Sequence, residues 1–99
     1  MLRTPAKTAR ILISIYQEKQ DPYVMSFDQF RIAGKRDQIK EGFYNPVYTK
    51  LNEKGYSIID LRPASDSVAI IKVDEIINGW KKIGSLTVKK HSNPNLKSK

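Results

Sequence analysis

The sequence has no cysteine and a single histidine, His91. The missing cysteine excludes disulfides, thiolate metal sites and a cysteine nucleophile, and it is typical of a reducing compartment. His91 stands in a lysine-rich segment, where we interpret it as a solvated residue rather than a ligand or general base. Gly-rich phosphate loops and His/Asp/Glu clusters at metal-ligand spacing are also missing. We therefore expect no enzymatic activity, no cofactor and no metal site.

Long hydrophobic runs are missing as well. No stretch approaches the roughly 20 apolar residues that a membrane-spanning helix needs, and the first ten residues lack the apolar run of a secretory signal. We therefore expect a cytoplasmic protein without a membrane partner. The 39% of hydrophobic residues in 99 positions are nevertheless enough for one core. The sequence predicts one domain over residues 1–84, followed by a basic, flexible tail over residues 85–99.

Acidic residues are fewer than basic ones, and the difference is concentrated at the ends. The chain has 18 basic and 10 acidic residues, which gives a net charge of +8. Residues 1–10 carry three basic side chains and residues 81–99 carry six, with no acid in either segment. A lysine near a phosphate releases a condensed counterion and so adds affinity for any nucleic acid. This distribution favours a polyanionic partner, although basic ends also keep small proteins soluble.

The first part of the chain predicts a helix and then a short extended segment. Thr4 is a good N-cap and Pro5 suits the first helical position, so we expect a helix over residues 5–19. Apolar residues recur in it at spacings of three and four, which is typical of a helix with one buried face. Residues 23–25 read as an extended segment.

The middle of the chain predicts further helices. Ser26 and Gln29 form a capping-box pattern that begins a second helix, and Gly34 is its natural end. We expect residues 36–41 to be helical again and Gly42 to break that helix.

Asn45 and Pro46 read as the N-cap and first residue of another helix that runs to Lys54, with Gly55 in the C-terminal cap. We favour two short helices here, or a helix that begins at a turn. The alternative is a single helix kinked at Pro46, because apolar residues recur every four positions across it.

Beyond Gly55 the hydrophobic period changes from helical to extended. Residues 56–62 and 68–73 are rich in β-branched residues, and the segment between them has turn-forming residues, so we expect a hairpin. Asp74 then reads as the cap of a short helix over residues 75–83. The polar remainder is predicted to hold at most a brief strand at residues 86–88.

The order helix, short strand, helix, helix and two-stranded hairpin resembles that of the winged helix-turn-helix superfamily. The most specific local match is Asn45-Pro46-Val47-Tyr48-Thr49-Lys50-Leu51-Asn52-Glu53-Lys54-Gly55-Tyr56. It is similar to the recognition helix of bacterial winged-helix regulators, which closes with a Leu-x-x-x-Gly turn into the first wing strand. The resemblance covers about residues 5–73. It implies an α+β, mainly helical fold with a three-helix core, a β-wing of two or three strands and an additional C-terminal helix.

The resemblance also implies a DNA-binding surface. A helix over residues 45–54 in a major groove would turn Val47 and Leu51 to the core and its amide and hydroxyl side chains to the bases. Tyrosines near its start could bond phosphates, although Tyr48 is as readily interpreted as a core residue. The predicted DNA-binding residues are Arg36, Lys40, Tyr44, Asn45, Thr49, Lys50, Asn52, Arg62, Lys89 and Lys90.

We therefore expect a sequence-specific duplex-DNA-binding protein, acting as a small transcriptional regulator or a DNA-organising accessory protein. A protein-binding scaffold of the same fold is an alternative, because the last predicted helix has an apolar stripe. That stripe favours a homodimer or another protein partner, and it consists of Ile76, Ile77, Trp80 and Ile83. RNA binding is a further alternative, favoured by the basic ends but without any RNA-binding sequence signature.

Overall fold

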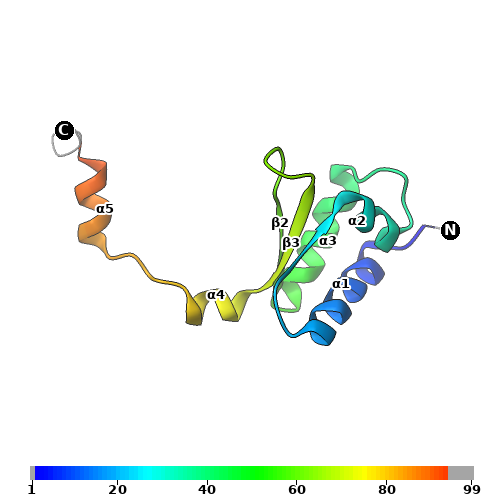
Figure 1. The fold of residues 1–99 in the computed structure, drawn as a ribbon, viewed down its shortest axis with the longest axis horizontal. Coiled ribbons are helices and arrows are strands. Elements are labelled where there is room, and N and C mark those ends of the chain that lie inside the picture. The colour runs from blue at the N-terminus through cyan, green and yellow to red at the C-terminus, as the bar shows by residue number, and fades with distance from the viewer. Residues whose placement is uncertain (1, 94–99) are drawn as a thin grey trace.

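A computed structural model describes residues 2–93 of the chain (Figure 1). In this part of the chain, five helices accompany one three-stranded antiparallel sheet, which confirms the expected α+β, mainly helical class. The elements in chain order are α1 (Pro5–Lys19), β1 (Tyr23–Ser26), α2 (Phe27–Gly34), α3 (Glu41–Glu53), β2 (Tyr56–Asp60), β3 (Ser67–Lys72), α4 (Val73–Gly79) and α5 (Ser85–Ser92).

The central strand of the sheet is β3, which pairs with β1 on one side and with β2 on the other. The predicted hairpin is therefore confirmed as β2 and β3, and the extended segment before the second helix adds a third strand. Ile70 of β3 lies between Tyr23 and Ile58, whereas the next residue along, Ala69, lies between Val24 and Ile59. Because side chains alternate across a strand, these two rows point to opposite faces of the sheet.

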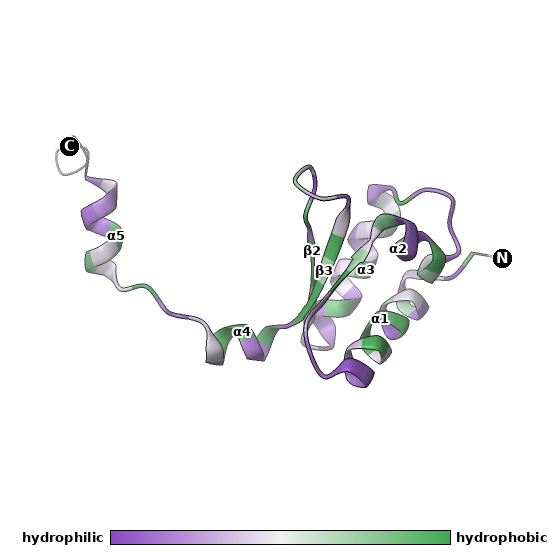
Figure 2. Ribbon diagram, in the orientation of Figure 1, coloured by the Kyte–Doolittle hydropathy of each residue, from purple (hydrophilic) through white to green (hydrophobic). Residues whose placement is uncertain are grey.

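The hydrophobic core lies between the inner face of the sheet and helices α1, α2 and α3. The helices bury their apolar stripes against Ile58, Val68 and Ile70 of the sheet, as the hydropathy colours suggest (Figure 2). The largest side chains with almost no exposure include Phe30 and Leu12. Burial of a residue of this size contributes roughly 1.5–3 kcal/mol to the hydrophobic term, so these stripes hold the three helices on the sheet.

The two helix starts predicted from capping residues are both confirmed. The Thr4 hydroxyl accepts a hydrogen bond from the amide of Lys7 at 3.1 Å, with Pro5 in the first turn of α1. In α2, the Gln29 amide donates to the Ser26 hydroxyl at 3.1 Å and the Ser26 amide donates to the Gln29 side chain at 3.0 Å. The reciprocal pair satisfies two amides that a helix start leaves free.

The segment between α2 and α3 differs from the prediction. Residues 35–40 are not helical, because Lys35 ends α2 in the left-handed region (φ 51°) and the following loop leads directly to α3. Gly42 does not break a helix but lies in the first turn of α3. The expected second helical segment at residues 36–41 is therefore wrong.

One helix, α3, replaces the two short helices that we favoured, and Pro46 lies inside it. The buried residues Phe43, Val47 and Leu51 are spaced by four and continue through Pro46. Packing of this stripe outweighs the hydrogen bond that proline cannot donate to the Gly42 carbonyl. The C-terminal cap is confirmed, since Gly55 follows the helix with a φ of 86°.

The C-terminal part extends away from the rest of the molecule (Figure 1). We call residues 2–72 the body and residues 73–93 the arm. The helix expected at residues 75–83 is shorter and earlier, as α4, and the strand predicted at residues 86–88 is wrong, since α5 occupies them. A lone strand would need a partner for its backbone groups, whereas a helix bonds its own. Lys97 and Lys99 of the predicted tail lie outside the described residues.

The arm makes the molecule long and narrow. The radius of gyration is 17.2 Å and the extents are 58 × 27 × 20 Å, whereas a compact chain of this length has a radius of about 13 Å. No residue of α4 or α5 is buried. All buried residues of the described chain therefore belong to the body.

Candidate nucleic-acid interface

The outer face of α3 carries exposed amide and hydroxyl side chains. Asn45, Thr49 and Asn52 are exposed, while Val47 and Leu51 on the opposite side have no exposed surface. With 100° between successive residues, the three polar side chains share one face that points away from the core. The structure thus gives these residues the orientation that the sequence predicts for them.

The flanks of α3 combine basic and aromatic residues. Lys40 is exposed at the start of the helix, and Lys50 is exposed on the side that faces α1, 3.8 Å from the Glu53 carboxylate. Tyr48 is 44% exposed, which favours the contact role over the core role. Tyr44 is half-buried, with its ring edge-on to Phe30 at 6.3 Å between centroids, and burial raises the pKa of its hydroxyl.

Arg36 is tied into the body rather than projecting from it. Its guanidinium lies 3.9 Å from the centre of the Phe43 ring and donates a 2.9 Å hydrogen bond to the Arg3 carbonyl. The Arg3 side chain donates in turn to the carbonyls of Ile32 and Ala33. These contacts fasten the N-terminal segment and the loop after α2 to the core, so Arg36 is less available to a ligand than Lys40.

Arg62 in the hairpin turn is similarly engaged. Its guanidinium stacks 4.0 Å above the centre of the Phe27 ring and donates to both carboxylate oxygens of Asp60, the shortest bond being 2.7 Å. These hydrogen bonds lower the pKa of Asp60. The turn hydroxyls of Ser65 and Ser67 lie 2.6 Å apart and bond each other. The positive charge that Arg62 gives the wing is therefore largely balanced by the Asp60 carboxylate.

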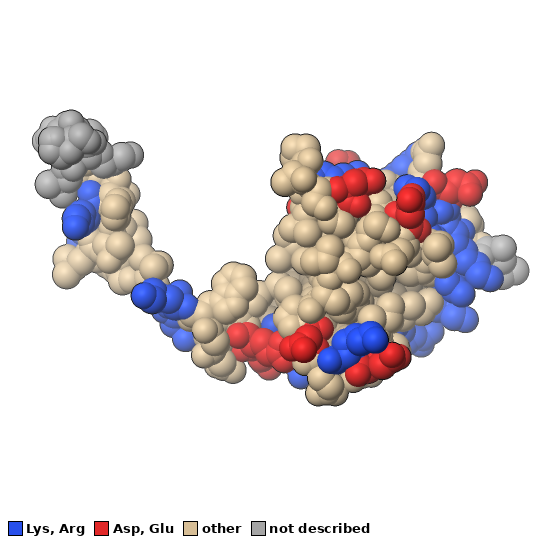
Figure 3. All heavy atoms as spheres, viewed as in Figure 1, with Lys and Arg blue, Asp and Glu red and all other residues tan. Residues whose placement is uncertain are grey.

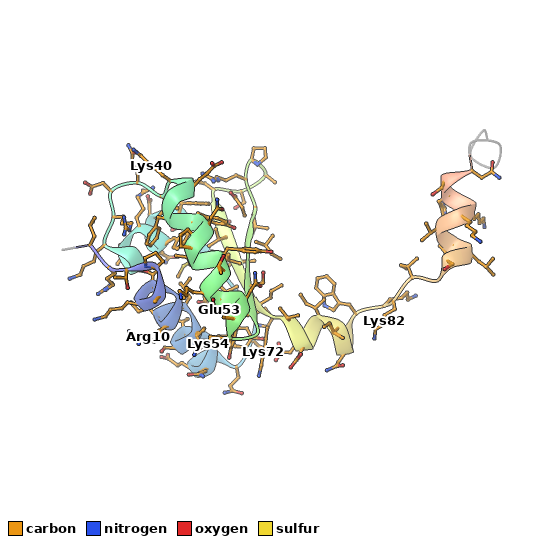
Figure 4. All side chains as sticks on the ribbon, turned by 180° about the vertical axis from the view of Figure 1, so that it is seen from behind. Arg10, Lys40, Glu53, Lys54, Lys72 and Lys82 are labelled. Atoms are coloured by element: carbon orange, nitrogen blue, oxygen red, sulfur yellow. The ribbon has the colours of Figure 1, made fainter. Side chains whose placement is uncertain are left out.

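Three basic residues that the sequence analysis did not select converge at the other end of α3. Arg10 of α1, Lys54 after α3 and Lys72 at the end of β3 line one surface groove with Ser14 and Gln17. Figure 4 shows the three basic residues at this end of α3. No acidic residue lines this groove. These cations come from three elements far apart in the sequence, so only the fold brings them together. In the sequence, each of them can be recognised only as a basic residue next to the apolar residues of a helix or strand.

The remaining predicted contact residues lie in the arm. Lys89 and Lys90 are exposed on α5, far from α3 (Figure 1). Of the predicted partner contacts, Ile76 is half-buried, whereas Ile77, Trp80 and Ile83 are more than half exposed. The structure does not bring these two groups together with the outer face of α3.

The chain matches no protein-family model, no curated protein and no solved structure. No helix among residues 2–93 combines the length and apolar character that crossing a membrane requires. In the same part of the chain, no three carboxylate or imidazole side chains gather where they could hold a metal ion.

Proposed function

We propose that the chain is a winged helix-turn-helix protein that binds duplex DNA with sequence preference, as a small transcriptional regulator or a DNA-organising accessory protein. The order α1, β1, α2, α3 and the β2–β3 hairpin, with β1 paired to β3, supports this proposal. In it, α3 is the recognition helix and the turn between β2 and β3 is the wing.

One observation carries the proposal: α3 is fixed by its aliphatic side and presents neutral hydrogen-bonding groups outward. An asparagine can bond an adenine edge with two hydrogen bonds, and a threonine offers a hydroxyl or a methyl group to thymine. Asn45, Thr49 and Asn52 are of these types and share one exposed face. A helix held rigidly by Val47 and Leu51 presents them in a constant geometry.

Basic residues at both ends of α3 supply the accompanying phosphate contacts. Lys40 lies at one end, and Lys54 with Arg10 and Lys72 at the other (Figure 4). A major groove is about 12 Å wide and is bordered by phosphates on both sides, so a helix within it needs cations along its borders. Lys89 and Lys90 of the arm add contacts that are indifferent to sequence.

The test begins with selection of bound fragments from genomic DNA, followed by fluorescence-anisotropy titrations. The selected duplex, a scrambled duplex, the single strand and RNA are compared at two salt concentrations. We expect the selected duplex to remain preferred at the higher salt. Equal and steeply salt-dependent binding to all four, or preference for RNA, contradicts the proposal.

A pair of double variants then tests the assignment of α3. Asn45→Ala with Thr49→Ala should reduce the preference for the selected over the scrambled duplex by roughly 10-fold or more, since each base contact contributes about 1–3 kcal/mol. Asn78→Ala with Thr87→Ala removes the same groups from exposed positions of the arm and should leave the preference unchanged. Equal effects of the two variants would overturn the assignment. Deletion of residues 89–99 should weaken binding to every DNA alike.

We propose self-association through the arm as a second function. The exposed apolar residues Ile77, Trp80 and Ile83 favour it, because large apolar side chains in water gain nothing from their exposure. Ile77 lies on α4, whereas Trp80 and Ile83 lie in the segment between α4 and α5 rather than on the predicted helix. A homodimer would present two copies of α3 to a palindromic site.

A further inference from the structure

The outer face of the sheet carries an uncovered row of apolar residues with serines beside it. Val24, Ala69 and Ile59 form a row across β1, β3 and β2, with Ile71 of β3 on the same face. Val24 is 63% exposed and Ile59 is 39% exposed. The sheet lies in front of α3 in the view of Figure 1, and Figure 3 shows from the same side a broad uncharged area whose borders carry acidic residues together with some basic ones. Antiparallel sheets commonly turn a polar face to water, whereas the outer face of this sheet combines Ser26, Ser57 and Ser67 with four apolar residues and no charged one.

The arm carries a second set of uncovered apolar residues. Trp80 is 66% exposed, and Leu86 of α5 is 81% exposed, with Ile77, Ile83 and Val88 also on the surface. After Glu75 the described arm contains four lysines and no acidic residue. Two such arms would repel each other, whereas the sheet face offers an uncharged surface with acids beside it.

The arm does not lie on the sheet of its own chain, because α4 is held in an outward direction. It begins directly at Val73, whose amide donates to the Gly55 carbonyl at 2.9 Å. The Tyr16 hydroxyl donates a hydrogen bond to the Glu75 carboxylate, which ties the first turn of α4 to α1. From these anchors the arm leads away from the body (Figure 1).

We infer that two copies of the chain exchange arms, so that Trp80 and its apolar neighbours in one copy cover the outer sheet face of the other. This inference deepens the proposed self-association, on which it rests, and it names the receiving surface. In a two-fold dimer, each chain gives one arm and receives one arm, so the arm-to-face contact occurs twice. The two contacts together bury twice the area of one, which brings the total toward the roughly 1,200–2,000 Å² of a stable interface. The lysines of the arm then meet the acidic borders of the face.

The exchanged arms leave the outer side of α3 open. The core separates this side of α3 from the outer sheet face, as the opposite views of Figures 1 and 4 show. Self-association and DNA binding therefore use different surfaces, and each can be tested without the other.

Trp80 is the sole tryptophan of the chain and lies in the arm, so its fluorescence reports arm docking directly. We expect the emission maximum of the full chain to shift to shorter wavelength as concentration rises, in parallel with a doubling of mass in sedimentation velocity. Val24→Lys or Ile59→Lys should raise the concentration for half-association by roughly 30-fold or more, the effect of losing an interface hot spot. The matched control is Ile32→Lys, at a residue of α2 that is 72% exposed, and it should change neither measurement. Circular dichroism checks that each variant is folded.

A mixing experiment identifies the contact between chains. The Trp80→Ala chain has an intact sheet face and no tryptophan, while the Ile59→Lys chain has an intact arm. Titration of the first into the second should shift the emission of the second to shorter wavelength, because one docking contact is restored.

Four results would overturn the inference. If the chain is a monomer with exposed Trp80 at all concentrations, the proposed self-association is wrong as well, and the DNA-binding proposal is unaffected. A dimer that is indifferent to Val24→Lys and Ile59→Lys, or a mixture without a shift, keeps self-association but places the arm elsewhere. A monomer with short-wavelength emission shows that the arm folds onto its own sheet.

Discussion

The body and the arm are built from similar helices but differ in what surrounds them. In the body, α1, α2 and α3 bury their stripes against one sheet face. In the arm, α4 and α5 have apolar residues at comparable density, yet none is buried. Short helices gain most of their stability from packing rather than from intrinsic propensity. The contrast teaches that an apolar stripe predicts a contact, whereas the fold decides whether the contact lies within the chain.

The largest expected difference between body and arm is in the free energy of unfolding that a leucine-to-alanine substitution removes. Leu51 has no exposed surface, whereas Leu86 is 81% exposed. We expect Leu51→Ala to lower the free energy of unfolding by about 2–5 kcal/mol, because it leaves a cavity in the core. Leu86→Ala should change it by no more than about 0.5 kcal/mol in the monomer. Urea unfolding at low protein concentration measures both. Similar losses would show that the arm is packed in solution.

A second pair compares two glycines. A Cβ at Gly34 would lie 2.8 Å from Cζ of the buried Phe43 ring, whereas a Cβ at Gly79 of α4 has no atom within 4 Å. Gly34→Ala should therefore cost about 1–3 kcal/mol through overpacking. Gly79→Ala should have no cost and should raise the helix content of the arm slightly, because alanine favours helix. Thermal unfolding and far-ultraviolet circular dichroism give the two readouts, and a loss at Gly79 would indicate a contact on the arm.

The hydrogen bond that joins the two regions gives a pH-dependent effect of intermediate size. Burial, followed by the hydrogen bond to Glu75, raises the pKa of Tyr16 to about 12. An unfolded tyrosine ionises near pH 10, so this contribution to stability is complete below about pH 10 and is lost as pH rises toward 12.

We expect Tyr16→Phe to cost about 1 kcal/mol at neutral pH and to flatten the alkaline decline in stability. Unfolding measured as a function of pH tests this, with Tyr48→Phe at an exposed position as the control. An unchanged alkaline slope would show that Tyr16 does not link α1 to α4. Tyr23, whose pKa burial also raises, stays intact in both variants.

The smallest effects concern the lysines that each region offers to DNA. Lys89→Ala with Lys90→Ala should leave the stability unchanged and should reduce the slope of log affinity against log salt by about 2. Arg10→Ala with Lys54→Ala should do the same at the body. Affinity titrations over several salt concentrations separate the two. If only one double variant changes the slope, only that region contacts phosphates.

The body could be predicted in large part, because local signals and tertiary packing agree there. Thr4 and Ser26 mark helix starts, and Gly55 marks the point where the period changes from helical to extended. The pairing of β1 with β3 is different, since only the core determines which distant strand a four-residue segment joins.

The candidate site was predictable where it lies on one helix and hidden where it spans several elements. The exposure of Asn45 and Thr49 follows from the spacing of Val47 and Leu51 within α3. The meeting of Arg10 with Lys72 does not, because it depends on how α1 crosses the end of β3. The engagement of Arg36 with Phe43 was equally hidden, since a sequence shows its charge but not the ring beneath it.

Pro46 removes one hydrogen bond from the backbone ladder of α3. The Gly42 carbonyl has no amide donor four residues on, and the first turn is held by the amides of Phe43 and Tyr44, which donate to the Lys40 carbonyl, and by the buried Phe43 side chain. Local opening there costs less than opening of the later turns, and hydrogen exchange should be fastest at its amides. The buried side chains of Phe43 and Val47 fix the helix on both sides of Pro46. Opening of the first turn therefore changes the exchange rates of its amides without changing the direction in which Asn45 and Thr49 point.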